Sequence, residues 1–216
     1  MVRSVHDFSV LAGERVARGS GQEEQAAVLT YGLEVLLGIV IEAGVILGLA
    51  WLLGITATAI VILVSFLSFR LLSGGSHCTA YYRCLLLSTI VFLSLAALAG
   101  PLGDLVTSRP WVMAVTGLGI FFMTWRWAPV DTPQKPLPPE KLPARRFWCQ
   151  FYILAWYVLI SYLPLPPAWL GATLLGVLWQ AFSVTPAGEK FTRGADFLLA
   201  LAVFKKEEVK ERVVAD

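Results

Sequence analysis

Three scarcities limit what this chain of 216 residues can do. It contains no asparagine, so none of its sites can depend on an asparagine side chain. Its two histidines and three cysteines are too few for a disulfide framework or for most metal-ligand clusters. Charged residues make up 15% of the chain, whereas soluble domains carry about a quarter. The composition therefore argues against a disulfide-stapled or ordinary soluble domain, and we expect no metal or other cofactor.

Apolar residues are abundant and concentrated in six blocks. A helix needs about 20 residues to cross a bilayer core about 30 Å thick, and the blocks approach that length. They cover residues 32–53, 55–72, 84–100, 109–126, 147–163 and 167–185. Tight turns at Gly54, at Gly100-Pro101 and between Pro164 and Pro167 join them in pairs. The sequence predicts an all-α polytopic membrane protein, with about six transmembrane helices in three hairpins.

The basic residues indicate an orientation for these spans. In a model with six spans, every Lys and Arg except Arg109 falls on one side of the membrane. The positive-inside rule makes that side cytoplasmic. We therefore expect both termini and the loop at 73–83 to be cytoplasmic. The first twenty residues contain charges and no apolar core, so we expect no cleavable signal peptide.

We expect a single membrane-embedded domain over residues 1–216, with interfacial amphipathic helices at both ends. The end segments, 1–27 and 186–216, mix apolar and basic residues, which suits the inner leaflet of a membrane. The last ten residues fit a solvated tail equally well. A basic loop at 127–146 includes the stretch APVDTPQKPLPPEKLP, whose six prolines favour an extended connector over a helix.

The basic residues of this loop have two interpretations. They are Lys135, Lys141, Arg145 and Arg146. The loop could be a linker only, or its cations could hold an acidic ligand.

The stretch RLLSGGSHCTAYYRCLLLS, at residues 70–88, carries the main candidate for chemistry. A thiolate beside an imidazole is the minimal pair of a cysteine hydrolase. Cys84 stands where a loop becomes an apolar helix, and a helix N-terminus favours the thiolate. His77 precedes it by seven residues.

The spacing of this pair constrains the local fold. Along one straight helix, residues seven apart are separated by about 10 Å. Direct hydrogen bonding needs roughly 3–3.5 Å. We therefore expect His77 in a turn begun by Gly74-Gly75, and a helix bearing Cys84 that begins at about Thr79.

A third group often orients the imidazole in such sites. Because asparagine is absent, a Cys-His-Asn arrangement is excluded. Glu34 and Glu42 lie in the first apolar block, where carboxylates are costly and often functional, and Glu34 is nearer the cytoplasmic end. Ser88, one turn beyond Cys84, could donate to an oxyanion or only pack. Glu34 and Ser88 are therefore our candidate supporting residues.

The other two cysteines have simpler interpretations. Cys149 lies inside the fifth block, where a thiol most often packs as a small apolar group. Cys78 also fits packing, with a redox or metal role as the alternative.

Several of these residues together resemble the accessory gene regulator B family. The pattern is Arg70, the GGSH element at 74–77, Cys84 before an apolar helix, and Ala128-Pro129 before a Pro- and Lys-rich run. The resemblance extends over essentially the whole chain. One departure is Cys78, where a small residue such as alanine is expected.

The resemblance implies a membrane cysteine endopeptidase of bacterial quorum sensing. Such an enzyme cuts the acidic C-terminal tail from an autoinducing-peptide precursor and closes the remainder into a thiolactone or lactone through a Cys84 thioester. It makes His77 and Cys84 catalytic, with Arg70 and Gly75 as supporting residues. It also implies a bacterial plasma-membrane protein that contacts membrane lipids, forms a homodimer and has no nucleic-acid partner.

Three rival functions stay open on the sequence. A transporter or permease would use the intramembrane Glu34 and Glu42, and its transport would survive loss of Cys84. A non-catalytic membrane scaffold would need neither His77 nor Cys84. A lipid acyltransferase would also use Cys84 as its nucleophile.

Overall fold

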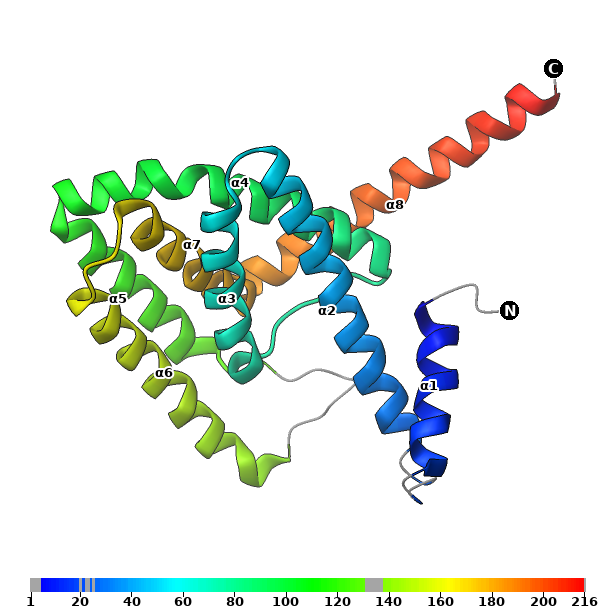
Figure 1. Cartoon of the computed structure of the whole chain (residues 1–216), viewed down its shortest axis with the longest axis horizontal. Helices are drawn as coiled ribbons and strands as arrows, with labels where there is room; N and C mark the ends of the chain where they lie inside the picture. The colour runs from blue at the N-terminus through cyan, green and yellow to red at the C-terminus, as the bar shows by residue number, and fades with distance from the viewer. Residues whose placement is uncertain (1–4, 20, 22–23, 25, 131–137, 216) are drawn as a thin grey trace. The chain divides into compact units, whose positions relative to one another are not determined.

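The computed structural model describes residues 5–19, 21, 24, 26–130 and 138–215, and every regular element in this part of the chain is a helix (Figure 1). The all-α prediction is therefore confirmed. The helices are α1 (Val5–Gly19), α2 (Ala26–Leu52), α3 (Thr56–Ser73), α4 (Tyr81–Ser108), α5 (Pro110–Trp127), the short 3-10 helix η2 (Pro139–Lys141), α6 (Leu142–Tyr162), α7 (Pro167–Ser183) and α8 (Pro186–Ala215).

The chain divides into two compact units, residues 1–48 and 49–216. In the first unit, α1 packs closely on the start of α2. A Cβ atom added to Gly13 would meet the backbone and side chain of Thr30. Ser9 and Ala17, one turn on either side of Gly13, are also buried. The N-terminal segment is therefore a helix with one face packed on α2, and its predicted place at the membrane interface stays a prediction.

The second unit is built around α7, which is buried along most of its length. It packs chiefly on α3 and α4, and Figure 1 shows it surrounded by the neighbouring helices. Glycines allow this approach. A Cβ on Gly171 would meet the Ala99 carbonyl, and one on Gly176 would lie 2.8 Å from the Ile62 carbonyl oxygen. Close backbone contact of this kind is typical of helix packing in membranes.

All six predicted apolar blocks are helical, and two of the three predicted turns are confirmed. Gly54 joins α2 to α3 at a φ of +73°, and residues 163–166 join α6 to α7. Pro110, Pro167 and Pro186 each begin a helix, where the missing N–H costs nothing.

The predicted turn at Gly100-Pro101 is wrong. Helix α4 continues through both residues to Ser108, and the turn to α5 is at Arg109. A proline removes one helical hydrogen bond without always ending the helix. Here the packing of α4 on α7 continues past the proline, because Gly103 lies directly against the Pro167 carbonyl. This contact supports the extra turns that the local sequence signals did not predict.

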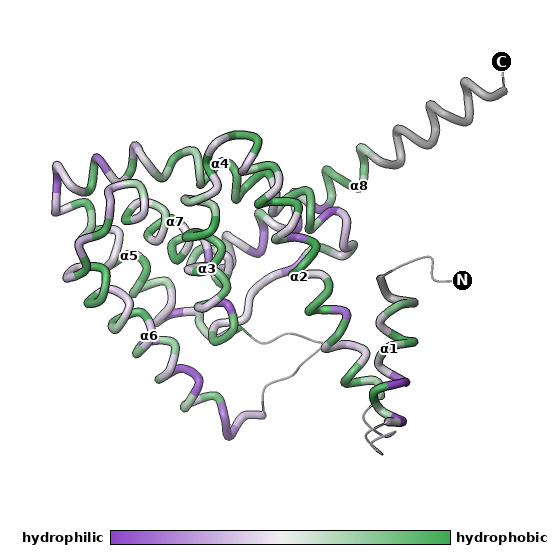
Figure 2. The backbone as a smooth tube through the Cα atoms, viewed as in Figure 1, coloured by the Kyte–Doolittle hydropathy of each residue, from purple (hydrophilic) through white to green (hydrophobic). Residues whose placement is uncertain are grey.

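The helices have the surface of a membrane protein. Large apolar side chains are exposed along many of them, and Figure 2 shows hydrophobic residues over most of α2, α3 and α4. By length and composition, these three described helices could each cross a bilayer. A fourth span is possible if α7 and residues 186–202 of α8, which are bent by 87°, count as one.

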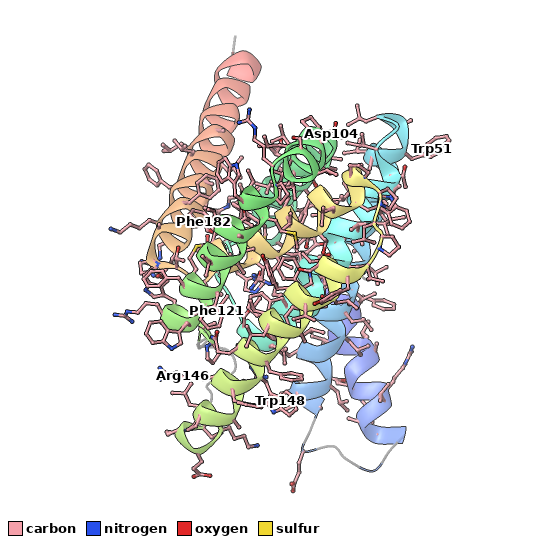
Figure 3. All side chains as sticks on the ribbon, turned by 90° about the vertical axis from the view of Figure 1, so that its left-hand side faces the viewer. Trp51, Asp104, Phe121, Arg146, Trp148 and Phe182 are labelled. Carbon is pink, nitrogen blue, oxygen red and sulfur yellow. The ribbon has the colours of Figure 1, made fainter. Side chains whose placement is uncertain are left out.

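The six-span arrangement in three hairpins therefore stays a prediction. Helix α6 begins with polar and basic residues, and α5 ends in Trp125-Arg126-Trp127, so the apolar part of each is short. Figure 3 shows Arg146 and Trp148 at one end of the second unit and Asp104 at the other. The single membrane-embedded domain also stays a prediction.

Candidate active site

The glycine pair ends α3 and creates the loop that carries His77. Gly74 has a φ of +70° and Gly75 a φ of +149°, conformations that favour glycine. Residues 74–80 are not helical, and α4 begins at Tyr81, so Cys84 lies in its first turn. Both predictions, His77 in a turn and a helix beginning near Thr79, are confirmed to within two residues. Because the helix is interrupted between them, His77 and Cys84 need not be held about 10 Å apart as they would be along one straight helix.

Gly75 also makes room for Arg70. A Cβ atom there would collide with the Arg70 guanidinium and lie 3.3 Å from Ser183 Oγ. The glycine thus has both a conformational and a steric reason to be in this position.

The Arg70 side chain lies on the His77 imidazole. Its Nη2 is 3.0 Å from His77 Nε2 and 3.5 Å from Nδ1, and it donates to the Ser76 carbonyl oxygen at 2.9 Å. The guanidinium also lies over the Phe66 ring, 5.4 Å from its centre. These contacts fix the loop to the last turn of α3.

Burial, and then the Arg70 charge, lower the pKa of His77 to about 4. The side chain is exposed in this structure, with the Arg70 guanidinium against its ring. At neutral pH the imidazole is therefore uncharged.

Gln180 is a central polar residue that the sequence reasoning missed. It is fully buried in α7. Its Nε2 donates to Ser73 Oγ at 2.8 Å and to the Gly74 carbonyl at 2.6 Å, and its Oε1 lies 3.3 Å from Arg70 Nη1. One side chain thus connects the glycine break and Arg70 to the core helix. A lone glutamine in an apolar helix was the signal that could have identified it.

The loop also contacts α8, far away in sequence. Ser76 Oγ lies 3.2 Å from Thr192 Oγ1. Thr79 Oγ1 donates to Asp196 Oδ2 at 2.8 Å, and Arg83 Nη1 forms an ion pair with Asp196 Oδ1 at 3.1 Å. No local pattern predicts these contacts, because more than a hundred residues separate the partners.

The three cysteines differ in their surroundings. Cys149 is fully buried in α6, which confirms its interpretation as a packing residue. Cys78 and Cys84 are half-buried free thiols. Burial, then the neighbouring Cys84 and Asp196, raise the pKa of Cys78 to about 12, although Arg83 opposes the shift.

The structure places His77 in the loop before α4 and Cys84 in the first turn of that helix, four residues after the loop ends. Among the hydrogen bonds of the described residues, none joins His77 to Cys84, and the imidazole is engaged by Arg70 instead. Ser88 lies half-buried on α4, one turn beyond Cys84. Glu34 and Glu42 are half-buried on α2 within the separate unit of residues 1–48, so their predicted roles stay predictions.

The predicted basic group is only partly described. Lys141, the last residue of η2, and Arg146, near the start of α6, are exposed. Arg145 is half-buried beside Arg146, and Lys135 lies outside the described residues. Figure 3 shows the Arg146 side chain on the outer surface of this end of the helix.

Comparisons with known proteins agree on one family. The model of the Accessory gene regulator B family, AgrB, matches residues 14–184. An AgrB-like protein of Listeria monocytogenes serotype 4a (strain HCC23) is 28% identical over 180 residues, covering 82% of this chain and 84% of the relative. One of Clostridium perfringens (strain SM101 / Type A) is 25% identical over 208 residues, covering 89% and 96%. No solved structure matches.

Proposed function

Because this chain belongs to the AgrB family, we propose that it is a membrane cysteine endopeptidase that processes an autoinducing-peptide precursor in quorum sensing. One observation carries the proposal most directly. The Gly74-Gly75 break takes His77 out of the helix and leaves Cys84 in the first turn of α4. A nucleophile at a helix N-terminus and a neutral imidazole that can reach it are what this kind of acyl transfer requires.

The first half of the proposed reaction cleaves the precursor. His77 takes the thiol proton of Cys84, and the sulfur attacks the carbonyl carbon of the scissile peptide bond. As the tetrahedral intermediate collapses, the C–N bond breaks and His77 gives its proton to the leaving amine. The acidic C-terminal tail leaves as a free peptide, and the remaining peptide is held as a thioester on Cys84.

The second half closes the ring. A thiol or hydroxyl of the bound peptide attacks the thioester carbonyl, its proton passes to His77, and the bond to Cys84 sulfur breaks. The product is a thiolactone or lactone, and Cys84 recovers its proton. A thiolactone exchanges one thioester for another, so this step is nearly neutral in energy and is drawn forward by loss of the tail. A partly buried site would limit competing hydrolysis by water.

The remaining parts of the proposal concern substrate and membrane. Lys141, Arg145 and Arg146, together with Lys135, would attract the acidic tail. Arg70 and Gly75 would support the site, and Glu34 or Ser88 would complete it.

We further propose a homodimer of six-span chains in the bacterial plasma membrane, in contact with its lipids, with both termini and the loop at 73–83 cytoplasmic. Family membership does not favour the transporter alternative.

Mass spectrometry of the purified full-length protein tests the proposal. The protein is incubated with synthetic precursors that have an amphipathic leader, a central cysteine and an acidic tail. The wild type should release the tail and gain the mass of the remaining peptide. Cys84→Ala should do neither, and His77→Ala should be slowed by at least about a hundredfold. Cys149→Ala, which removes a buried thiol elsewhere, is the matched control. Cleavage by Cys84→Ala at the wild-type rate would refute the assignment of the nucleophile.

A further inference from the structure

One face of α8 lies along the candidate active-site loop. Gly188, Thr192 and Asp196 follow one another at intervals of four, so they share this face. Gly188 lies directly against the Phe182 carbonyl, which keeps the start of α8 close to α7. Thr192 then reaches Ser76, and Asp196 reaches both Thr79 and Arg83.

Both carboxylate oxygens of Asp196, and its backbone carbonyl, contact residues at the start of α4. Oδ2 accepts a hydrogen bond from Thr79 and Oδ1 pairs with Arg83. The Asp196 carbonyl oxygen also accepts from Arg83 Nη1 at 3.3 Å. Thr79 stands just before the helix and Arg83 just before Cys84. The carboxylate therefore holds the segment before the proposed nucleophile at both ends.

Helix α4 lacks a local device to fix its N-terminus. Its N-cap is Ala80, which offers no side-chain acceptor, and its first turn contains no acidic residue. Negative charge near a helix N-terminus is stabilising, and here the anion comes from another helix. The side chains of Asp196 and Arg83 are only 11% and 18% exposed, so water screens the pair weakly.

The Asp196 carboxylate also affects how readily the Cys78 thiol ionises beside Cys84. The groups that act on Cys78 are Cys84 and Arg83 from α4 and Asp196 from α8. Asp196 and Cys84 disfavour the Cys78 thiolate, and Arg83 favours it. Neutralising Asp196 would remove its contribution and leave that of Arg83, which favours a thiolate on Cys78.

We propose that Asp196 is a positioning residue of the candidate active site, which fixes the start of α4 and keeps Cys78 from competing with Cys84 as the nucleophile. This inference rests on the proposed function where it calls Cys84 the nucleophile. The contacts of Asp196 and the relative reactivity of the two thiols do not depend on that function. Asp196 lies beyond residues 14–184, the part of the chain that the family model matches. The proposed positioning role therefore depends on a residue of α8 that lies outside the matched segment.

Alkylation without any peptide substrate tests the inference. The full-length protein is treated with iodoacetamide from pH 6 to pH 10, and mass spectrometry gives separate rates for Cys78 and Cys84. In the wild type, Cys84 should react much faster. In Asp196→Asn the ratio of the two rates should fall by about tenfold, as expected for a shift of one unit in the pKa of Cys78. Because no cleavage is measured, the result is independent of whether the protein proves to be a peptidase.

Two further variants make the outcome decisive. Glu189→Gln removes an exposed carboxylate of α8 that is paired with Arg193, and its ratio should equal that of the wild type. Thr79 is exposed, so Thr79→Val should fold even if Asp196→Asn does not. It removes one of the two side-chain contacts of Asp196 and should move the ratio in the same direction. An unchanged ratio in either Thr79→Val or folded Asp196→Asn would overturn the proposal, as would an equal change in Glu189→Gln.

Discussion

Arg70 donates a hydrogen bond to His77 across 3.0 Å, and this bond occupies the imidazole nitrogen that a catalytic thiol would need. A guanidinium only donates, so Nε2 is the acceptor and the proton of the neutral ring lies on Nδ1. A neutral imidazole has one acceptor nitrogen. In the proposed reaction, His77 would take a proton from Cys84 only after Arg70 has released the ring. In this structure the acceptor nitrogen of the proposed base is therefore engaged by Arg70.

Replacing Arg70 by glutamine should shift the pH dependence of the proposed reaction. With Arg70 present, the pKa of His77 is about 4, so the ring is neutral throughout the physiological range. Without the charge this pKa should rise towards 6.5. The acidic limb of tail release, measured as rate against pH, should therefore move upwards. Arg109→Gln, which removes an exposed charge at the α4–α5 turn, should leave the profile unchanged.

The same shift predicts a trend in stability. The folded pKa of His77 lies below the value of 6.5 expected for the unfolded chain. The neutral ring therefore favours folding above pH 6.5, and this contribution is lost as the pH falls towards 4. Thermal unfolding of the wild type and of His77→Gln between pH 4 and pH 7 measures it. The difference between the two proteins should change across this range, and a constant difference would contradict the shift.

Gly75→Ala should disable the site and destabilise the second unit by about 1–3 kcal/mol. The added methyl group would meet the Arg70 guanidinium, and the φ of +149° suits glycine. Gly100→Ala is the control, because a Cβ there meets nothing within 4 Å and the residue is helical. It should be neutral or stabilise by about 0.5–1 kcal/mol. Thermal unfolding in detergent compares them, and equal effects would refute the steric argument.

The sequence predicted the parts of the site that depend on neighbouring residues. Gly74-Gly75 indicated the end of α3, and the spacing of His77 and Cys84 required a break between them. The path of α4 beyond Pro101 was not predictable in the same way, because contact with Pro167, far along the chain, sustains the helix there. Asp196 gave no local signal for the same reason.

Gln180 lies between these two cases, because its polar side chain stands out in an apolar helix but its partners lie far away in the sequence. It yields a further prediction. Its amide satisfies Ser73, Gly74 and Arg70. Gln180→Leu would remove all of these contacts and leave the Gly74 carbonyl with only a 3.4 Å bond from Ser73, at a cost of about 1–3 kcal/mol for each buried group that loses its bond. Chemical denaturation should show a large loss of stability.

Gln150→Leu provides the contrast for this experiment. Its buried Oε1 has no hydrogen-bond partner among the described residues, so removing it should be neutral or stabilising. Similar losses for the two glutamines would show that the buried network around Gln180 contributes no more than one unpaired amide.

The basic start of α6 should determine how well the acidic tail is captured. Arg145→Gln combined with Arg146→Gln should raise KM while leaving kcat nearly unchanged, because a remote charge that binds substrate and transition state equally affects binding alone. Exposed charges are screened within about 8 Å at physiological ionic strength. The difference from wild type should therefore shrink as salt is added. Lys190→Gln removes an exposed charge on α8 and should leave KM unchanged. A KM that is insensitive to both the double substitution and salt would place the tail elsewhere, and a fall in kcat instead would indicate that these arginines act on the reacting bond.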